Sequence, residues 1–408
     1  MKTLLLLGGS RQQVPVIEKA KSMGYRTVLI DYLQDNPGQY VADKWYPEST
    51  TDIEAVCRIA EKEKVNGILA YASDPAALPA AIVCERLGLP TNPAESVAVL
   101  GVKHKFRDFL KKHNFACPQT FTFSPTDSHN SIVEGLSTLS FPIVIKPTDS
   151  SGSKGVSFLA DTGALQKSIK EADKYSRNKI LIAEEFIERG FPDVIGGDIF
   201  VENGQITLYG DMACLRGDNG RSLIPIGEKL PNGLTENQKR HLYEELQRLI
   251  DELHMTSGEL NIEVIIDKEG QPHFLEVGPR AGGNMIPIQL SDALHVDLVE
   301  ANIKAALGEP VALHPKELQG CYATFVLHSE KSGIFNGYRL TPFAKKHLYR
   351  EVLYKKAGNA VKSFDGAGKA IGILFFKFDK VSEMESLYGN YADHINVVVI
   401  SKTGGGDL

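Results

Sequence analysis

The first hundred residues alternate short apolar runs with amphipathic stretches. The apolar run Leu4–Leu7 ends at Gly8-Gly9, an amphipathic stretch follows it, and a second apolar run ends at Asp31. The pattern then continues as helix, strand and helix at Ile53–Lys64, Gly67–Tyr71 and Pro75–Gly88. Strands that alternate with helices predict a doubly wound, Rossmann-like α/β domain over residues 1–100. The first glycine turn does not match G-x-G-x-x-G, so it does not favour a dinucleotide site.

Residues 101–310 mix strands and helices without that alternation. Apolar runs of strand length predict strands at Phe121–Phe123, Phe141–Pro147 and Lys179–Ala183. Amphipathic patterns predict helices at Glu95–His113, Thr162–Tyr175, Thr235–Leu253 and Asp297–Leu307. Asn203-Gly204 is a hairpin-turn signal within Asp198–Asp211. This mixture predicts an α+β fold, and the apolar runs after Gly320 predict a small β-rich region over residues 311–408.

Composition and charge narrow the classes of partner. The chain has 408 residues, more than one hydrophobic core usually supports, so two or three domains are expected. Its formal net charge of -6 offers no basic footprint for nucleic acid and no polybasic patch for a membrane. Small-molecule partners are therefore expected. The five cysteines are scattered and lack C-x-x-C spacing, which favours reduced thiols, a cytoplasmic location and no zinc site.

Two carboxylates and an arginine stand close together in the stretch Asn261–Pro287. Apolar residues at strand spacing on both sides of Lys268-Glu269-Gly270 predict a β-hairpin. Glu263 and Glu276 would then lie on adjacent strands, next to Arg280. Carboxylates among apolar residues are costly to bury unless they are paired or bind a cation, so the pattern indicates a divalent metal that holds a phosphate. The alternative is a hairpin face that is simply solvated.

Lys146 ends an apolar strand a few residues before a loop rich in serine and glycine. A lysine in this place would neutralise phosphate oxygens, while Gly152 and Gly155 let backbone N–H groups approach them. The loop does not match G-x-x-x-x-G-K-[ST], so it is not a Walker P-loop. It fits either a lid that closes over a triphosphate or a flexible turn.

The chemistry-bearing residues follow one another in an order that resembles the ATP-grasp superfamily. In sequence they are Lys103, Lys146, the glycine loop, the strand end Glu184–Ile187, Glu263 and Glu276. That superfamily contains carboxylate–amine and carboxylate–thiol ligases, including biotin carboxylase, glycinamide ribonucleotide synthetase and the amino-acid ligases. The resemblance implies a pre-ATP-grasp Rossmann-like domain at residues 1–100 and an ATP-grasp domain at 101–310, with a lid near 118–187. Residues 311–408 would form a C-terminal β-rich subdomain.

The resemblance also implies a role for each position. ATP would be bound by Lys103, Lys146, Ser151, Gly152, Ser153, Gly155 and Val156 on the phosphate side, and by Glu184, Glu185, Phe186 and Ile187 at the adenine. Glu263 and Glu276 would hold Mg²⁺, or Mn²⁺ in its place. Lys146 and Arg280 would stabilise the transferred phosphoryl group. Taken alone, the run Glu184–Ile187 is more typical of the start of an exposed turn.

The chain departs from the superfamily pattern at two places. The metal strand commonly reads E-x-N-x-R, whereas Gly278 stands here in the asparagine place. Asn284 is the candidate that would supply the missing oxygen ligand. The acidic residue that usually contacts the ATP ribose has no clear counterpart, and Asp193 or Glu188 would take that role.

The expected activity is that of a ligase that activates a small carboxylate as an acyl phosphate with ATP and joins it to an amine. The products would be ADP and phosphate, with a C–N bond favoured over a C–C or C–S bond. Arg216, Arg221 and Lys229, in the stretch Gly210–Pro231, lie where they would hold an anionic substrate or form ordinary surface charge. Three alternatives stay open: a purine-pathway-like ligase or carboxylase that uses carboxyphosphate, a dinucleotide-dependent oxidoreductase, and a non-catalytic nucleotide-binding protein. A homodimeric assembly is also left open.

Overall fold

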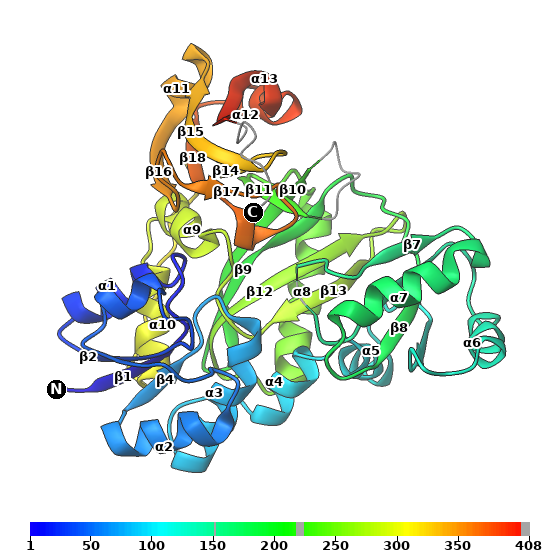
Figure 1. The fold of residues 1–408 in the computed structure, drawn as a ribbon, viewed down its shortest axis with the longest axis horizontal. Helices are drawn as coiled ribbons and strands as arrows, with labels where there is room; N and C mark the ends of the chain where they lie inside the picture. Colours follow the sequence, from blue (N-terminus) through cyan, green and yellow to red (C-terminus); the bar gives the residue numbers. More distant parts are fainter. Residues whose placement is uncertain (151, 218–223, 401–408) are drawn as a thin grey trace, which may run out of the picture.

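The computed structural model describes residues 1–150, 152–217 and 224–400 and arranges them in four β-sheets (Figure 1). An eight-stranded central sheet lies in the middle. The parallel N-terminal sheet lies on one side of it, and a four-stranded antiparallel sheet, here called the lid sheet, lies on the other. A three-stranded sheet belongs to the C-terminal region. The predictions for Ser151 and Arg221 fall outside the described residues.

The N-terminal sheet has the strand order β3-β2-β1-β4, and all its pairings are parallel. Its strands are β1 (Thr3–Leu7), β2 (Arg26–Ile30), β3 (Lys44–Tyr46) and β4 (Gly67–Leu69). The helices between and after them are α1 (Val14–Ser22), α2 (Ile53–Glu63) and α3 (Asp74–Leu87). β1 is buried along its whole length, as expected for a parallel strand that is covered on both faces. The predicted alternation of strands and helices is confirmed.

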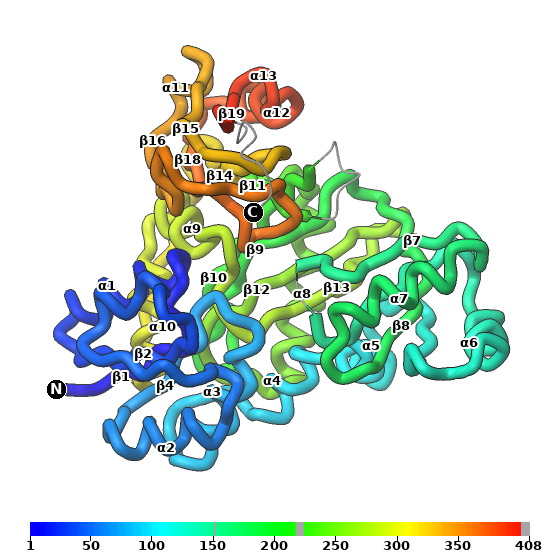
Figure 2. Tube along the Cα trace, in the orientation of Figure 1, coloured from blue at the N-terminus to red at the C-terminus, as the bar shows by residue number. Residues whose placement is uncertain are grey.

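The N-terminal sheet is covered partly by a helix from much later in the chain. The helix α10 (Leu298–Ala306) packs beside α1, so the yellow and blue segments lie together in the tube view (Figure 2). Val299 and Ile303 of α10 belong to the same buried cluster as Leu4 and Leu6. The N-terminal sheet is therefore joined to the rest of the molecule by an apolar interface.

The lid sheet separates an apolar face from a charged one. Its order is β5-β8-β6-β7, made of β5 (Thr120–Phe123), β8 (Leu181–Glu185), β6 (Ile143–Pro147) and β7 (Ser157–Leu159). Ile143 and Ile145 face a core that includes residues of α6 (His129–Leu136) and α7 (Leu165–Tyr175). Because side chains alternate along a strand, Lys146 points to the opposite face. That face is the one on which the site is built.

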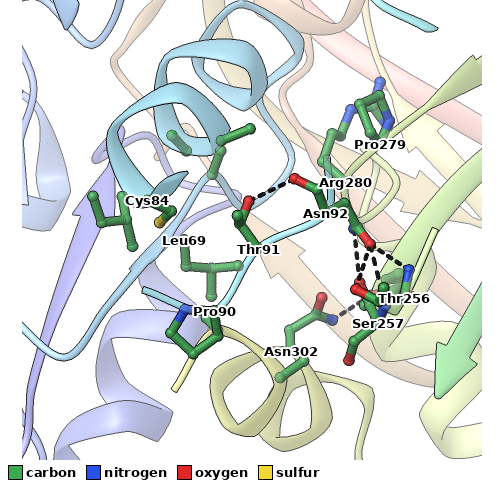
Figure 3. A pocket seen from close by; sticks show the side chains of 18 of the residues that line it. Leu69, Cys84, Pro90, Thr91, Asn92, Thr256, Ser257, Pro279, Arg280 and Asn302 are labelled. Carbon is green, nitrogen blue, oxygen red and sulfur yellow. Dashed lines mark hydrogen bonds between the residues drawn. The ribbon is translucent and has the colours of Figure 1, made fainter. Parts of the chain in front are cut away.

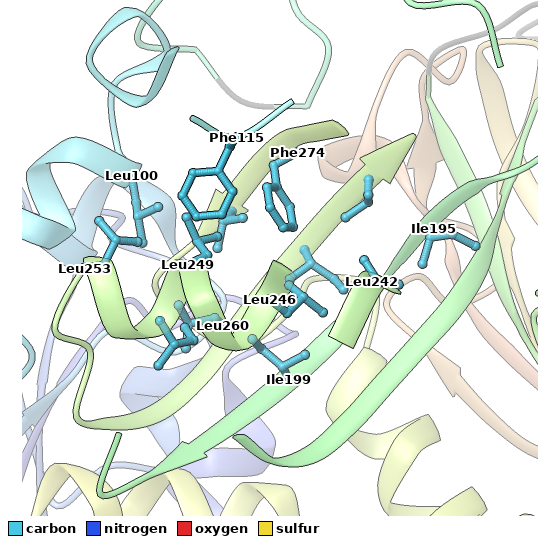
Figure 4. Close-up of a cluster of buried hydrophobic side chains, with 14 of the residues drawn as sticks. Leu100, Phe115, Ile195, Ile199, Leu242, Leu246, Leu249, Leu253, Leu260 and Phe274 are labelled. Carbon is cyan, nitrogen blue, oxygen red and sulfur yellow. The ribbon is translucent and has the colours of Figure 1, made fainter. Parts of the chain in front are cut away.

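The central sheet has the order β13-β12-β9-β10-β11-β14-β18-β16, and all the pairings between its described strands are antiparallel. Its strands along the chain are β9 (Val194–Glu202), β10 (Gln205–Arg216), β11 (Pro225–Leu230), β12 (Ser257–Ile266), β13 (Pro272–Gly278), β14 (Cys321–Leu327), β16 (Leu348–Leu353) and β18 (Gly372–Phe378). The helix α8 (Glu236–Glu252) begins at a capping box on Thr235 and buries Leu242, Leu246 and Leu249 against one face (Figure 4). The other face carries the carboxylates of the site.

The single helix predicted over Glu95–His113 is wrong. The structure has two helices, α4 (Ala94–Leu100) and α5 (Lys103–Lys112), with Val102 in an extended conformation between them. Gly101 ends α4, and its poor helix propensity fits a break at this point. The break lets α5 start afresh at Lys103, which places that lysine at a helix N-terminus.

The remaining elements lie mostly in the C-terminal region. They are α9 (Ile286–Leu294), β15 (Gly333–Leu340), α11 (Pro342–His347), β17 (Ala360–Val361), α12 (Val381–Gly389), α13 (Tyr391–His394) and β19 (Ile395–Ile400). The β-rich character predicted for residues 311–408 is confirmed, although β15, β17, α11, α12 and α13 were not predicted, and neither was α9, which precedes this region. In the described part of the chain, no helix is both long and apolar enough to cross a membrane.

Candidate active site

The two glutamates of the predicted hairpin face each other. β12 and β13 pair antiparallel, and Glu263 stands directly opposite Glu276 in the register. A β-bulge follows this pair, because Val264 is next opposite Phe274, so Leu275 is an extra residue on β13. Side chains of directly opposite residues project from the same face of a sheet. The hairpin prediction is therefore confirmed, and both carboxylates lie on one side of it.

Lys103 connects this pair of carboxylates to the loop before the glycine segment. Its Nζ lies 3.2 Å from Oε2 of Glu276 and donates a hydrogen bond of 2.6 Å to the carbonyl of Ser150. Burial opposes the negative charge of Glu276, but Lys103 and Arg280 outweigh it and lower the pKa of Glu276. Glu276 is therefore an ionised carboxylate at neutral pH.

Lys146 is buried beside Glu184, which carries a second cation. Lys146 Nζ lies 2.6 Å from Oε2 of Glu184, and Arg107 Nε lies 2.9 Å from Oε1 of the same carboxylate. Burial lowers the pKa of Lys146 to about 8 against the opposing pull of Glu184. Burial also opposes the charge of Glu184, but Arg107 and Lys146 lower the pKa of that carboxyl to about 2. One carboxylate thus serves two cations.

Arg280 is held by a carboxylate from the N-terminal part of the chain. Its Nε donates to Oδ1 of Asp74 at 2.7 Å, its Nη2 lies 2.6 Å from the same oxygen, and its Nη1 donates to the carbonyl of Ala281 at 3.0 Å. A guanidinium has five N–H donors, so further donors are left for an anion. Asp74 begins α3 and was not singled out in the sequence.

The glycine at position 278 has a steric explanation. A Cβ atom at Gly278 would lie 3.1 Å from Cζ of Arg280 and 3.2 Å from Oδ1 of Asp74. An asparagine here would therefore press on the ion pair between these two residues. Asn284 is held instead by the N-terminal segment, since its backbone N–H donates to Oε1 of Gln12 at 2.8 Å. Its buried Oδ1 has no hydrogen-bond partner among the described residues.

The glycine loop takes the backbone conformations that its sequence suggests. Gly152, Ser153 and Gly155 have φ values of 68°, 58° and 73°, in the left-handed region that favours glycine. A Cβ atom at Gly155 would also lie 3.1 Å from the backbone of Ala172. Val156 N donates to the carbonyl of Ser153, which closes a turn. The loop joins β6, which carries Lys146, to its antiparallel neighbour β7.

The predicted adenine hinge is largely engaged within the lid sheet. The backbone N–H of Glu185 donates to Gln119 and that of Phe186 donates to Pro142. β8 ends at Glu185, so Ile187 is the predicted hinge residue that lies furthest outside the paired strand. The exposed ring of Phe186 makes an edge contact with Phe158, with ring centroids 5.3 Å apart. This pair offers an aromatic surface beside the buried Lys146.

Both candidates for the contact with the ATP ribose, Asp193 and Glu188, form ion pairs with lysines. Asp193 lies 3.2 Å from Nζ of Lys229, and Glu188 pairs with Lys268 on the hairpin turn. Lys229 also contacts Glu385 at 2.9 Å. The side chain of Arg216 is largely buried and lies 3.1 Å from Oε2 of Glu263, so it is not ordinary surface charge.

The comparisons with known proteins give the family. A family model described as the carbamoyl-phosphate synthase L chain, ATP binding domain, matches residues 102–314, more than half of the chain. The chain belongs to this family. The predicted membership of the ATP-grasp superfamily is thereby confirmed. The matched segment contains every predicted metal and ATP ligand, from Lys103 to Asn284.

Individual relatives are more distant. The chain is 24% identical over 302 residues to the carbamoyl phosphate synthase large chain, C-terminal section, of Methanopyrus kandleri, covering 71% of this chain and 53% of that protein. It is 27% identical over 332 residues to the formate-dependent phosphoribosylglycinamide formyltransferase of Bacillus velezensis, covering 76% and 78%. The chain therefore spans about half the length of the first of these relatives.

The fold is shared with solved structures over nearly the whole chain. The L-amino acid ligase of Bacillus licheniformis superposes with a TM-score of 0.81 and 17% identity, covering 98% of this chain and 99% of that chain. At this level of identity the likeness describes the fold alone. It extends beyond the ATP-binding domain to both ends of the described chain.

The residues present fit a Mg²⁺ ion bound to a nucleotide. Glu263 and Glu276 offer carboxylate oxygens from facing positions, with the cations of Lys103 and Arg280 nearby. Among the described residues no group of three or more His, Cys, Asp and Glu side chains is gathered. An ion bound here would take its other ligands from phosphate oxygens and water, as Mg²⁺ commonly does.

Three further residues of the site were missed in the sequence: Arg107, Asp74 and Glu228. Arg107 stood in a basic helical run that fits a solvated face, but it lies one helical turn after Lys103, and that spacing was a usable signal. Asp74 lies 206 positions before Arg280, and no local pattern connects them. Glu228 stands between Gly227 and Lys229 on β11, and no pattern in the sequence marked it.

Glu228 is a buried carboxyl with one oxygen that accepts no hydrogen bond from the described residues. This oxygen is Oε2, and a Cβ atom at Gly196 would lie 3.3 Å from it. Burial raises the pKa of Glu228 to about 8, and the charge of Glu263 acts in the same direction. The backbone on both sides is fixed, because Tyr388 and Gln289 donate to the carbonyl of Glu228 at 3.0 Å.

A cavity of about 580 Å³ lies between the N-terminal region and the central sheet (Figure 3). Asn92 lines this cavity. Its side-chain Nδ2 donates to the carbonyl of Ser257 at 2.8 Å, and its Oδ1 accepts from the backbone N–H of Thr256. Arg280 and Glu259 also line it. Neither Lys146 nor the pair of facing glutamates is among its described lining residues, so it meets the candidate site only at Arg280.

Proposed function

We propose that the chain is an ATP- and Mg²⁺-dependent ligase that activates a small carboxylate as an acyl phosphate and joins it to an amine. The observation that carries this proposal is the facing pair Glu263 and Glu276 with Lys103 bound to Glu276. Lys146 from the lid sheet and Arg280 from the central sheet supply cations beside it. The site thus combines carboxylates that could bind a metal with cations that could bind phosphates, and these groups come from the lid sheet and the central sheet.

The first step transfers a phosphoryl group. An oxygen of the substrate carboxylate attacks the γ-phosphorus of ATP, the bond to the β-phosphate oxygen breaks, and ADP leaves. The charge on the transferred group is offset by the ammonium of Lys146 and the guanidinium of Arg280, which Asp74 holds in place. Mg²⁺, held by Glu263 and Glu276, would add positive charge at the phosphates.

The second step forms the new bond. The amine nitrogen attacks the acyl carbon, and the bond from that carbon to the phosphate oxygen breaks to release phosphate. The amine must lose a proton, and Glu228 is the carboxyl assigned to take it. Burial raises its pKa to about 8, so the ionised fraction of Glu228 is a stronger base than an ordinary carboxylate, and Gly196 packs against its buried Oε2 without a side chain. The glycine loop would close over the acyl phosphate and exclude water.

The proposal includes the organisation of the chain. Residues 1–100 form the pre-ATP-grasp domain, residues 101–310 the ATP-grasp domain and residues 311–408 the C-terminal subdomain. We place the enzyme in the cytoplasm, with small-molecule substrates and no nucleic-acid or membrane partner. Mn²⁺ would replace Mg²⁺ at the same two carboxylates.

The test is ADP release from Mg-ATP with panels of amino acids, other small carboxylates and bicarbonate, each with and without hydroxylamine. Hydroxylamine traps an acyl phosphate as a hydroxamate, so the expected result is hydroxamate formation with one class of carboxylate. ADP release that depends on bicarbonate without a hydroxamate would instead identify a carboxyphosphate route. No carboxylate-dependent ADP release across the panel, from protein that binds Mg-ATP, would contradict the ligase proposal.

A further inference from the structure

Arg107 is a fully buried arginine between the lid sheet and the central sheet. Its exposed fraction is 0%, and by volume it is the largest completely buried side chain among the described residues. It lies one turn after Lys103 on α5, and residues at this spacing share one face of a helix. The helix thus directs two cations toward the candidate ATP site.

The guanidinium of Arg107 contacts both sheets at once. Nε lies 2.9 Å from Oε1 of Glu184, in the lid sheet. On the other side, Nη1 donates to the carbonyl of Phe274 at 3.1 Å and Nη2 donates to the carbonyl of Leu275 at 2.9 Å. Phe274 and Leu275 form the β-bulge that directly precedes Glu276.

We propose that Arg107 is a positioning residue that fixes the lid lysine Lys146 and the metal strand relative to each other. It holds Glu184, which pairs with Lys146, and it holds the bulge that sets the direction of Glu276. The proposal rests on the assignment of Lys146 and Glu276 to the phosphates and the metal. It assigns to one side chain the alignment of groups that lie on two different sheets.

A purely structural role explains these contacts less well. Burying a guanidinium is unfavourable unless the group is fully paired, and an apolar side chain would fill the same space without that cost. A planar fork with several fixed donors is what can hold a carboxylate and two carbonyls together. Arg248, which is partly exposed at the edge of the same core, shows the structural use of an arginine: its Cζ lies 3.7 Å from the ring centroid of Phe115, and its Nη1 donates to the carbonyl of His113 at 3.0 Å.

The charge of Arg107 also acts on Lys146. The charged groups that face Lys146 are Glu184 on β8, Arg107 and Lys103 on α5, and Glu276 on β13. Arg107 is one of the two cations that lower the pKa of Lys146. Removing its charge would raise the pKa of Lys146, so that lysine would stay protonated to higher pH.

The test measures the Kd of Mg-ATP by titration calorimetry between pH 6.5 and 9.5, in wild type, Arg107→Gln, Arg107→Lys and the control Arg248→Gln. Affinity in the wild type should weaken as Lys146 loses its proton, near its pKa of about 8. Arg107→Gln should bind about tenfold more weakly at pH 7, because buried charged groups lose their partner. In Arg107→Gln the weakening of Mg-ATP binding at alkaline pH should begin at higher pH than in the wild type, because Lys146 would keep its proton longer.

Arg107→Lys keeps the positive charge but replaces the planar guanidinium, with its several N–H donors, by an ammonium group. It should bind more weakly at pH 7 but leave the alkaline loss where the wild type has it, and Arg248→Gln should match the wild type in both respects. If Arg107→Gln does not fold, the Arg107→Lys comparison alone decides. Folded Arg107 variants with wild-type Kd and wild-type pH dependence would overturn the inference. A wild type that fails to bind Mg-ATP would contradict the proposed function instead.

Discussion

At the scale of single residues, the site depends on ion pairs between distant positions. Lys146 is paired with Glu184, Lys103 with Glu276 and Arg280 with Asp74. Lys146 could be selected from the sequence because it ends an apolar strand before a glycine loop, Glu276 and Arg280 because they belong to the predicted hairpin stretch, and Lys103 only through the resemblance to the ATP-grasp superfamily. The pairings themselves and the partner Asp74 could not be predicted, since burial and pairing are set by tertiary packing.

Gly278 gives a residue-scale prediction. Replacing it by asparagine should lower turnover by on the order of tenfold, because a Cβ atom here would lie 3.1 Å from Cζ of Arg280 and 3.2 Å from Oδ1 of Asp74 and would shift this ion pair from its position. Steady-state ADP release measures the effect, with Gly270→Asn as control. Gly270 lies on the same hairpin with φ 81° and nothing within 4 Å of an added Cβ. Higher activity at low Mg²⁺ in Gly278→Asn would mean that the asparagine completes a metal site.

At the scale of elements, the hydrophobic pattern predicted helices and strands best where one face of the element is buried. The hairpin β12–β13 and the helix α8 follow from period-two and period-3.6 patterns, and both formed as predicted. The break between α4 and α5 was missed because the amphipathic pattern continues across Gly101. β15 was missed because its sequence, GIFNGYRL, interrupts the apolar positions with two glycines and an asparagine.

The helix α8 gives an element-scale prediction. Leu246→Ala should lower the free energy of unfolding by about 2–5 kcal/mol, the usual effect of removing a fully buried leucine. Leu246 is 0% exposed and packs in the cluster that covers one face of the central sheet (Figure 4). Urea unfolding followed by circular dichroism measures this, with the exposed Glu244→Ala on the same helix as control. Equal unfolding midpoints for the two variants would mean that α8 does not stabilise the sheet.

At the scale of the whole molecule, the site lies where three sheets meet. The lid sheet contributes Lys146, the central sheet contributes Glu263 and Glu276, and the segment after the N-terminal sheet contributes Asp74. The order of these groups along the chain was enough to predict the superfamily. The way α10 covers the N-terminal sheet was not predictable, because the pattern of a helix does not say which sheet it packs against.

The most direct test of the central claim is the turnover of Glu276→Gln, measured as Mg-ATP-dependent ADP release with the carboxylate identified by the hydroxamate screen. The substitution keeps the shape of the side chain and removes the charge that would hold the metal, so kcat should fall on the order of 10²-fold or more. Glu269→Gln, exposed on the turn of the same hairpin, should retain wild-type turnover. Near-normal turnover in Glu276→Gln would contradict a Mg-ATP site built on Glu263 and Glu276.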